Sequence, residues 1–219
     1  MGDPLEHSNC QFYLVVTVGP DGQALERLQP VLAHANPASI LITPAEGYTL
    51  EAQATLPLLQ AGQGRGSAVL IANDAQLART IKADGVHLDW SDDINQRYEE
   101  AREILGQRFI VGVDAGRSRH HAMSLGEAGA DYVGFGIPSF VEDRSKARER
   151  QEELIAWWAE IFEIPAVAFD VEDHEAAAQL ATAGADFVAR HLPSGLSPAD
   201  LQNWAVQCEA ATAMAPLSE

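Results

Sequence analysis

A short phrase of small residues, an aspartate and an apolar run occurs three times in this chain. It reads Ala83-Asp84-Gly85-Val86, then Ala128-Gly129-Ala130-Asp131-Tyr132-Val133, and finally Ala183-Gly184-Ala185-Asp186-Phe187-Val188. The aspartates stand at positions 84, 131 and 186, so they are 47 and 55 residues apart. These intervals are too long for one strand and one helix but fit two such units, so the phrase marks every second helix-to-strand joint. One further interval toward the N-terminus falls near residues 36–38. Four marked joints imply eight strands.

Eight short runs are apolar at nearly every position, which is typical of strands buried on both faces of a parallel sheet. The predicted strands are Phe12–Val18, Ser39–Thr43, Ala68–Ala72, Gly85–Leu88, Phe109–Val113, Tyr132–Phe135, Ala166–Phe169 and Phe187–Ala189. The predicted helices between them are Gly22–His34, Thr49–Gln63, Asp74–Ala83, Ile94–Leu105, Arg119–Ala128, Arg148–Ile161, His174–Ala183 and Pro198–Met214. The chain is therefore expected to be α/β, with an N-terminal tail of residues 1–10 and a single-domain (β/α)8 TIM barrel over residues 11–215.

An open doubly wound sheet is the alternative fold for such an alternation. The turn after the first predicted strand reads Val18-Gly19-Pro20-Asp21-Gly22. It lacks the glycine-rich fingerprint of a dinucleotide site, so the barrel is favoured.

The composition restricts the partners of this chain. A content of 47% hydrophobic and 21% charged residues is sufficient for a substantial core. The formal net charge of −18 at pH 7 repels polyanions. Nucleic acid and anionic membrane surfaces are therefore not expected as partners, and a small-molecule ligand is. A phosphorylated ligand would need a metal ion or a local cationic patch.

Cysteine usage and the start of the chain favour a cytoplasmic location. Cys10 and Cys208 are too few for a disulfide framework. The first residues are acidic without an apolar signal core, and no apolar run approaches the roughly 20 residues that span a bilayer. The adjacent Trp157 and Trp158 in a predicted helix indicate either internal packing or a subunit contact, and the second would make the protein a homo-oligomer.

Two predicted strands end in acidic residues at the edge of the barrel where catalytic sites form. Strand three is followed by Asn73-Asp74, and strand four is followed by a loop that holds Asp92 and Asp93. Neighbouring strand ends could let Asp74 share a Mg²⁺ ion with Asp92 or Asp93, since this ion prefers carboxylates, water and substrate phosphate. The same aspartates could instead cap the helices that follow.

The chain resembles the family of thiamine phosphate synthase and the TenI-like thiazole tautomerases. The resemblance covers roughly Ser67 to Ala189. The matching motifs are Val69-Leu70-Ile71-Ala72-Asn73-Asp74, Ala83-Asp84-Gly85-Val86-His87-Leu88, Ile110-Val111-Gly112-Val113 and Ala128–Gly136. The resemblance implies a TIM barrel in thiamine biosynthesis. In synthases of this family, a pyrimidine diphosphate joins a thiazole phosphate, with Mg²⁺ held by the residues that correspond to Asp74 and Asp92.

The chain departs from the family pattern where phosphate should bind. The cationic word expected after strand two is replaced by Thr43-Pro44-Ala45-Glu46-Gly47, and the serine expected after strand five is Asp114. The Thr-x-Thr-Lys word expected after strand six corresponds to residues 139–146, where Arg144 and Lys146 keep positive charge but the hydroxyl pattern is lost.

The predicted ends of strands seven and eight differ most from the family. A glycine pair that would let backbone N–H groups approach a phosphate is replaced by Phe169-Asp170. Small residues after strand eight are replaced by Arg190-His191. A ring and a carboxylate would block and repel phosphate, which argues against ordinary synthase activity.

Three hypotheses remain open. One is a diverged transferase in or near thiamine biosynthesis that uses Asp74 and Asp92 with Mg²⁺ and binds a phosphorylated precursor. Its expected substrate contacts are Asn73, Asp114, Arg144, Lys146 and Arg190. A second is a metal-independent, tautomerase-like enzyme with Asp170 and His191 as acid and base. A third is a barrel without chemistry that acts as a ligand sensor or complex partner. Strand alternation leaves open whether His87 faces the helices or the site.

Overall fold

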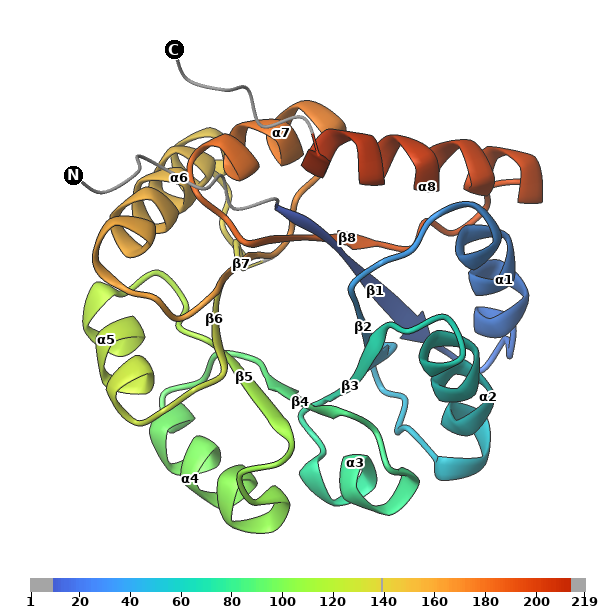
Figure 1. The fold of residues 1–219 in the computed structure, drawn as a ribbon, viewed down its shortest axis with the longest axis horizontal. Coiled ribbons are helices and arrows are strands. Elements are labelled where there is room, and N and C mark those ends of the chain that lie inside the picture. Colours follow the sequence, from blue (N-terminus) through green and yellow to red (C-terminus); the bar gives the residue numbers. More distant parts are fainter. Residues whose placement is uncertain (1–9, 139, 214–219) are drawn as a thin grey trace, which may run out of the picture.

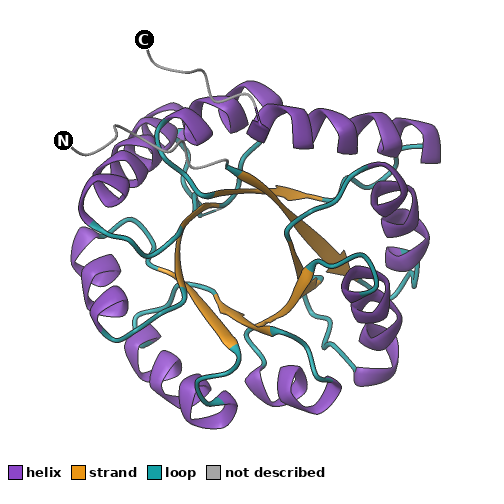
Figure 2. Ribbon diagram, viewed as in Figure 1, coloured by secondary structure: helices purple, strands orange, loops and turns teal. Residues whose placement is uncertain are grey.

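The structure is a computed structural model that describes residues 10–138 and 140–213 of the 219, and it forms a closed parallel barrel (Figure 1). The strands are β1 (Gln11–Val18), β2 (Ser39–Pro44), β3 (Ala68–Ala72), β4 (Gly85–Leu88), β5 (Ile110–Asp114), β6 (Tyr132–Phe135), β7 (Ala166–Ala168) and β8 (Phe187–His191). The helices are α1 (Ala24–His34), α2 (Ala52–Gln63), α3 (Ala75–Ile81), α4 (Ile94–Leu105), α5 (Arg119–Glu127), α6 (Arg144–Ile161), α7 (His174–Thr182) and α8 (Pro198–Ala213). Figure 2 shows the helices as an outer ring around the strands. The predicted TIM barrel is confirmed.

Each strand pairs in parallel with its neighbours in sequence, and β1 closes the barrel against β8. The predicted tail over residues 1–9, the position 139, and the predicted ends at 214 and 215 lie outside the described residues. Within the described parts of the chain, no helix is long and apolar enough to cross a membrane.

Strand alternation divides the buried side chains into two clusters. One set of strand side chains packs outward against the helices and includes Ile42, Val86 and Val188. The other set fills the barrel interior and includes Tyr13, Tyr132 and Phe169. Because successive strand residues face opposite sides, this division decides which residues at the strand ends can reach a site inside the barrel.

The aspartate of each repeated phrase joins two neighbouring strands at the N-terminal end of the barrel. The Oδ2 atoms of Asp84, Asp131 and Asp186 accept hydrogen bonds from backbone N–H groups of the preceding strands, at 2.7, 2.8 and 2.8 Å. The donors are the amides of Val69, Val111 and Ala166, respectively. The repeat therefore encodes a recurring strand clamp, and we call these three residues the clamp aspartates.

Helix α6 begins at Arg144 rather than at the predicted Arg148. The side chain of Asp143 accepts a hydrogen bond from the Lys146 amide at 3.2 Å. An aspartate N-cap satisfies a backbone donor in the first helical turn. The sequence did not reveal this cap because Asp143 lies among many other charged residues.

Candidate active site

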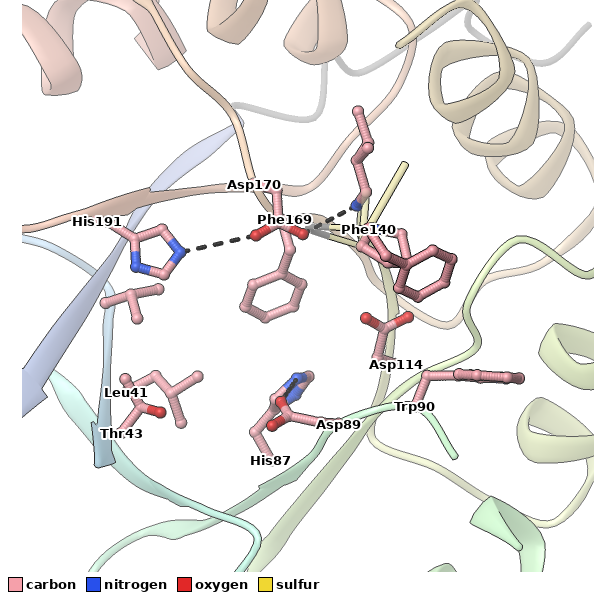
Figure 3. Close-up of a pocket in the computed structure, with 13 residues that line it drawn as sticks. Leu41, Thr43, His87, Asp89, Trp90, Asp114, Phe140, Phe169, Asp170 and His191 are labelled. Carbon is pink, nitrogen blue, oxygen red and sulfur yellow. Dashed lines mark hydrogen bonds and ion pairs between the residues drawn. The ribbon is translucent and has the colours of Figure 1, made fainter. Parts of the chain in front are cut away.

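A cavity of about 460 Å³ opens at the C-terminal ends of the strands (Figure 3). Its lining combines carboxylates, imidazoles and large apolar groups. It consists of Val15, Leu41, Thr43, His87, Asp89, Trp90, Asp114, Ile137, Pro138, Phe140, Phe169, Asp170 and His191. This is the end of the barrel at which barrel enzymes hold their catalytic residues. We call this space the central cavity.

Asp114 and Asp170 approach each other across Gly136, which follows β6. One carboxylate oxygen of Asp170 and one of Asp114 lie 2.8 and 2.9 Å from the position that a Cβ atom would take at residue 136. A Cβ atom there would force both carboxylates to shift, so glycine permits the positions that they take. Asp114 lies at the end of β5, and Asp170 follows β7 with a positive φ of 57°. Aspartate tolerates this left-handed conformation better than most residues. At this point of the chain, the adjacent Phe169 and Asp170 both line the cavity.

The carboxyl of Asp114 has a pKa near neutrality. The pKa of Asp114 is raised to about 7, chiefly by burial and also by the charges of Asp170 and Asp89, and backbone hydrogen bonds from Gly116 and Gly136 offset part of this rise. The Gly116 bond is 2.6 Å long. A carboxyl with this pKa can both take up and release a proton at neutral pH, as general acid–base catalysis requires.

His191 and Asp170 form a second acid–base pair on the opposite side of the cavity from Trp90 (Figure 3). The distance from His191 Nε2 to Asp170 Oδ1 is 3.8 Å. The other Asp170 oxygen, Oδ2, accepts a hydrogen bond of 2.9 Å from the Ile137 amide. This amide holds the Asp170 carboxylate in place beside the imidazole.

The floor of the cavity is a hydrogen-bonded chain of three buried side chains. His87 Nδ1 and the Tyr132 hydroxyl are 2.9 Å apart, and the Tyr132 and Tyr13 hydroxyls are 3.0 Å apart. Burial lowers the pKa of His87 to about 4 and raises the pKa values of both tyrosines, so all three groups are neutral at pH 7. His87 faces the interior because its neighbours Val86 and Leu88 face the helices, which resolves the alternative left open by the sequence.

Comparisons with known proteins place the fold and this site in a family context. Residues 12–191 match the family described as thiamine monophosphate synthase. The chain belongs to the thiamine monophosphate synthase family. It is 43% identical to the thiamine-phosphate synthase of Erythrobacter litoralis over 134 residues, which is 60% of this chain and 62% of that protein. It is 35% identical to the enzyme of that name from Rhodospirillum centenum over 190 residues, which is 83% of this chain and 87% of that protein.

Solved structures of low sequence identity show the same fold. A thiamine phosphate pyrophosphorylase from Pyrococcus furiosus superimposes with a TM-score of 0.72 at 18% identity, covering 94% of this chain and 96% of that one. A tryptophan synthase structure from Mycobacterium tuberculosis superimposes with a TM-score of 0.73 at 16% identity, covering 94% of each chain. At these identities the likeness concerns the barrel alone.

The two aspartates that the family resemblance assigns to Mg²⁺ lie away from the central cavity. Asp74 Oδ1 accepts a hydrogen bond of 2.8 Å from the Leu77 amide and caps α3, which is the second role considered for it. Asp92 is exposed in the turn before α4. In residues 10–138 and 140–213, no three His, Cys, Asp or Glu side chains gather as a metal-binding group. With one carboxylate used as a cap and Arg97 lining the same depression as Asp74, these donors do not fit a preformed Mg²⁺ site.

Asn73 organises the loops after β3 and β4 instead of lining the cavity. Its side chain donates to Asp89 Oδ2 at 2.6 Å, and its carbonyl oxygen accepts from the Asp89 amide at 2.9 Å and from Arg97 at 2.7 Å. Asn73 has a positive φ of 58°, which asparagine adopts more readily than most residues. These contacts fix Asp89, whose Oδ1 lies 3.7 Å from His87 Nε2.

The three cations expected to bind substrate are engaged elsewhere. Arg144 contacts Glu172 at 3.1 Å and also donates to the carbonyl oxygen of Ile137 at 3.3 Å. Lys146 is exposed and lies 3.3 Å from Asp143. Arg190 is buried on the helix side of β8, because inward-facing Ala189 precedes it, and it donates to the Glu172 carbonyl at 3.0 Å. None of these cations belongs to the described lining of the central cavity.

The central cavity thus combines some of the predicted residues with others that the sequence did not single out. Asp114, Asp170 and His191 line it together, whereas Asn73, Asp74, Asp92, Arg144, Lys146 and Arg190 do not. Asp89 and Trp90 are additions, and His87 is the residue whose orientation the sequence left open. The signal for Asp89 and Trp90 was their position directly after β4, at the catalytic edge of the barrel.

Proposed function

We propose that this chain is a small-molecule enzyme in or near thiamine biosynthesis that catalyses metal-independent proton transfer, as a tautomerase-like isomerase. One observation carries the proposal. The described lining of the central cavity holds Asp89, Asp114 and Asp170 with two histidines, and it contains no lysine or arginine. Such a lining supplies acids and bases but no counter-charge for a diphosphate.

The charges that line the central cavity oppose a reaction in which diphosphate is bound and displaced there. Three carboxylates face a common space of about 460 Å³, and a diphosphate there would meet their repulsion inside the barrel, where solvent screens charges poorly. The guanidinium of Arg144 is held by Glu172, which Arg148 also contacts. Bringing Arg144 to the cavity would break these bonds.

Asp114 and His191 suit the two ends of a proton transfer. The carboxylate of Asp114 takes a proton from a carbon atom of the substrate, since its pKa of about 7 makes the uptake favourable at neutral pH. The imidazolium form of His191, which lies beside Asp170, delivers a proton to a second atom of the substrate. The substrate keeps its composition, and exchange with solvent returns both groups to their starting states. The neutral side chains of the floor exclude water beneath the reacting atoms.

A deuterium-exchange experiment tests this proposal. Unphosphorylated thiazole and aminopyrimidine precursors are incubated with the protein in deuterated water, and loss of carbon-bound proton signals is followed by NMR. We expect exchange in at least one precursor, no change on adding EDTA, and loss of exchange in Asp114→Asn. Glu103→Gln removes an exposed carboxylate on α4 and serves as the matched control. Exchange that survives Asp114→Asn, or that requires Mg²⁺, would overturn the proposal.

A calorimetric titration provides the complementary test. We expect inorganic pyrophosphate with Mg²⁺ to give no binding heat at millimolar concentration. Binding in that range would restore the synthase hypothesis. Binding of an unphosphorylated precursor without any exchange would instead support the sensor.

A further inference from the structure

The geometry points to a substrate class for the central cavity: a planar organic cation, such as an amidinium, with its charged edge at Asp114 and its ring beside Phe169. This inference rests on the proposed function for the location of the ligand, and it adds the charge and shape of the molecule. Neither the family match nor the relatives' names assigns a cationic ligand.

The charge balance of the cavity favours a cation. Asp114 and Asp170 lie on either side of Gly136, and Asp89 approaches from the β4 end. The basic side chains in the described lining are His87 and His191. His87 is neutral at pH 7, and His191 Nε2 lies 3.8 Å from Asp170 Oδ1. Asp114 and Asp89 therefore face the cavity without a fixed positive partner in its lining, and a ligand cation would relieve their mutual repulsion.

The aromatic side chains favour a flat ligand. The Phe169 ring is held by Tyr13 and His87, with ring centroids 5.5 and 4.6 Å away. Trp90 and Phe140 stand at the mouth (Figure 3), where they remain 39% and 77% exposed. Exposed apolar groups gathered beside a cavity are typical of ligand-binding grooves, and aromatic faces attract cations.

The size of the cavity agrees with one or two rings. A volume of about 460 Å³ lies in the lower half of the range of small-molecule sites, roughly 300 to 1,000 Å³. Carboxylates also match an amidinium geometrically, because its two N–H groups are spaced like those of a guanidinium fork. The walls therefore provide both a planar slot and an acceptor for paired donors.

Three probes of one shape separate charge from shape. Benzamidine is a planar cation, benzamide is its neutral counterpart, and phenyl phosphate is an anion of similar size. Binding of each to the full chain is measured by NMR titration at pH 8, where Asp114 is ionised. We expect benzamidine to bind at least tenfold more tightly than benzamide, and phenyl phosphate not to bind at all.

Matched variants place the cation in the cavity. Asp114→Asn keeps the shape of the side chain and is expected to weaken benzamidine binding about tenfold or more, the usual effect of losing one charge-assisted hydrogen bond. Glu103→Gln is expected to leave it unchanged. Unfolding curves of both variants verify that each is folded, and Asp170→Asn provides a second variant if the first is not.

Each contrary result overturns the inference. Equal binding of benzamidine and benzamide would show that the site does not recognise charge. Preferred binding of phenyl phosphate would show that the site selects anions rather than cations. An absence of benzamidine binding up to 10 mM, roughly the weakest affinity expected of a fragment this size, would exclude the cation class. If Asp114-dependent proton exchange still occurred, the proposed function would stand and the substrate class alone would fall.

Discussion

Aspartates serve opposite purposes at the two ends of this barrel. At the N-terminal end, the clamp aspartates Asp84, Asp131 and Asp186 accept hydrogen bonds from buried strand amides. At the C-terminal end, Asp114 and Asp170 converge on a cavity whose described lining holds no lysine or arginine. The pKa of Asp114 rises to about 7 there. One end uses the carboxylate to hold strands together, and the other keeps it in a costly position that is useful for chemistry.

The comparison shows that the environment, rather than the residue type, assigns the role. Asp131 has a backbone donor at 2.8 Å and the guanidinium of Arg102 at 2.6 Å, so its charge is fully matched. Asp114 has backbone donors but is surrounded by the charges of Asp170 and Asp89. Catalytic sites commonly lower the stability of the fold that carries them, and the two ends of this barrel make that relation measurable.

The largest expected effect is on turnover. Asp114→Asn removes the group with a near-neutral pKa, and we expect proton exchange to fall about a thousandfold, within the range for loss of a general acid–base group. The measurement is the NMR exchange rate under saturating substrate. A variant with more than a tenth of the wild-type rate would show that Asp114 is not the base.

The next effect concerns the opposite end of the barrel. Asp131→Ala leaves the amide of Val111 without its carboxylate acceptor and removes the ion pair of Arg102, whose guanidinium keeps the backbone carbonyl of Phe109 as an acceptor. We expect the free energy of unfolding to fall by about 3 kcal/mol, because unsatisfied buried groups lose their hydration without compensation. Urea denaturation measures this, with benzamidine affinity expected to stay within twofold. Unchanged stability would remove the structural role of the clamp.

A smaller effect of opposite sign is expected for the stability of Asp114→Asn. The folded wild type holds its Asp114 proton up to about pH 7, whereas the unfolded chain releases it near the ordinary value of 3.8. The wild type therefore loses stability as the pH rises from about 4 to 7. The full shift would be worth roughly 4 kcal/mol, and partial exposure of Asp114 to solvent reduces this value. The variant escapes this loss, so we expect it to be about 2 kcal/mol more stable than the wild type at pH 8 and equally stable at pH 4. Denaturation of both proteins at the two pH values, with Glu103→Gln as control, decides the sign.

The smallest effect is expected at the mouth of the cavity. Phe140 is 77% exposed, so Phe140→Ala should leave the free energy of unfolding unchanged. Loss of one ring beside a bound cation should weaken benzamidine about threefold. Equal affinity in the variant would place the ligand away from Phe140 and deeper beside Phe169.

The fold could be predicted from the sequence because its signals are local and repeated. The phrase around Asp84, Asp131 and Asp186 marked the joints, and the apolar runs marked the strands. The beginning of α6 was missed, since the cap at Asp143 is one short residue within a charged segment.

The site could be predicted only in part, because it depends on how strand faces and long side chains are oriented. The sequence predicted Asp114 as a substrate contact through the family resemblance and Asp170 and His191 as acid and base at adjacent strand ends, and all three line the cavity. Arg190 was expected beside them, but strand alternation turns it toward the helices. Arg144 follows β6 closely in the sequence, which suggested that it would reach the cavity. Its guanidinium is instead held by Glu172, a partner 28 residues away that the sequence did not reveal.

Formation of thiamine phosphate tests the central claim most directly. The protein is incubated with hydroxymethylpyrimidine diphosphate, thiazole phosphate and Mg²⁺, and the product is followed by fluorescence after oxidation, with Asp74→Ala as a control. The account predicts no thiamine phosphate above the rate without protein, because the acidic cavity offers no counter-charge to the diphosphate. Product that forms with the wild type and disappears in Asp74→Ala would contradict it, and would make this barrel a synthase that binds its substrates through the loops after β3 and β4.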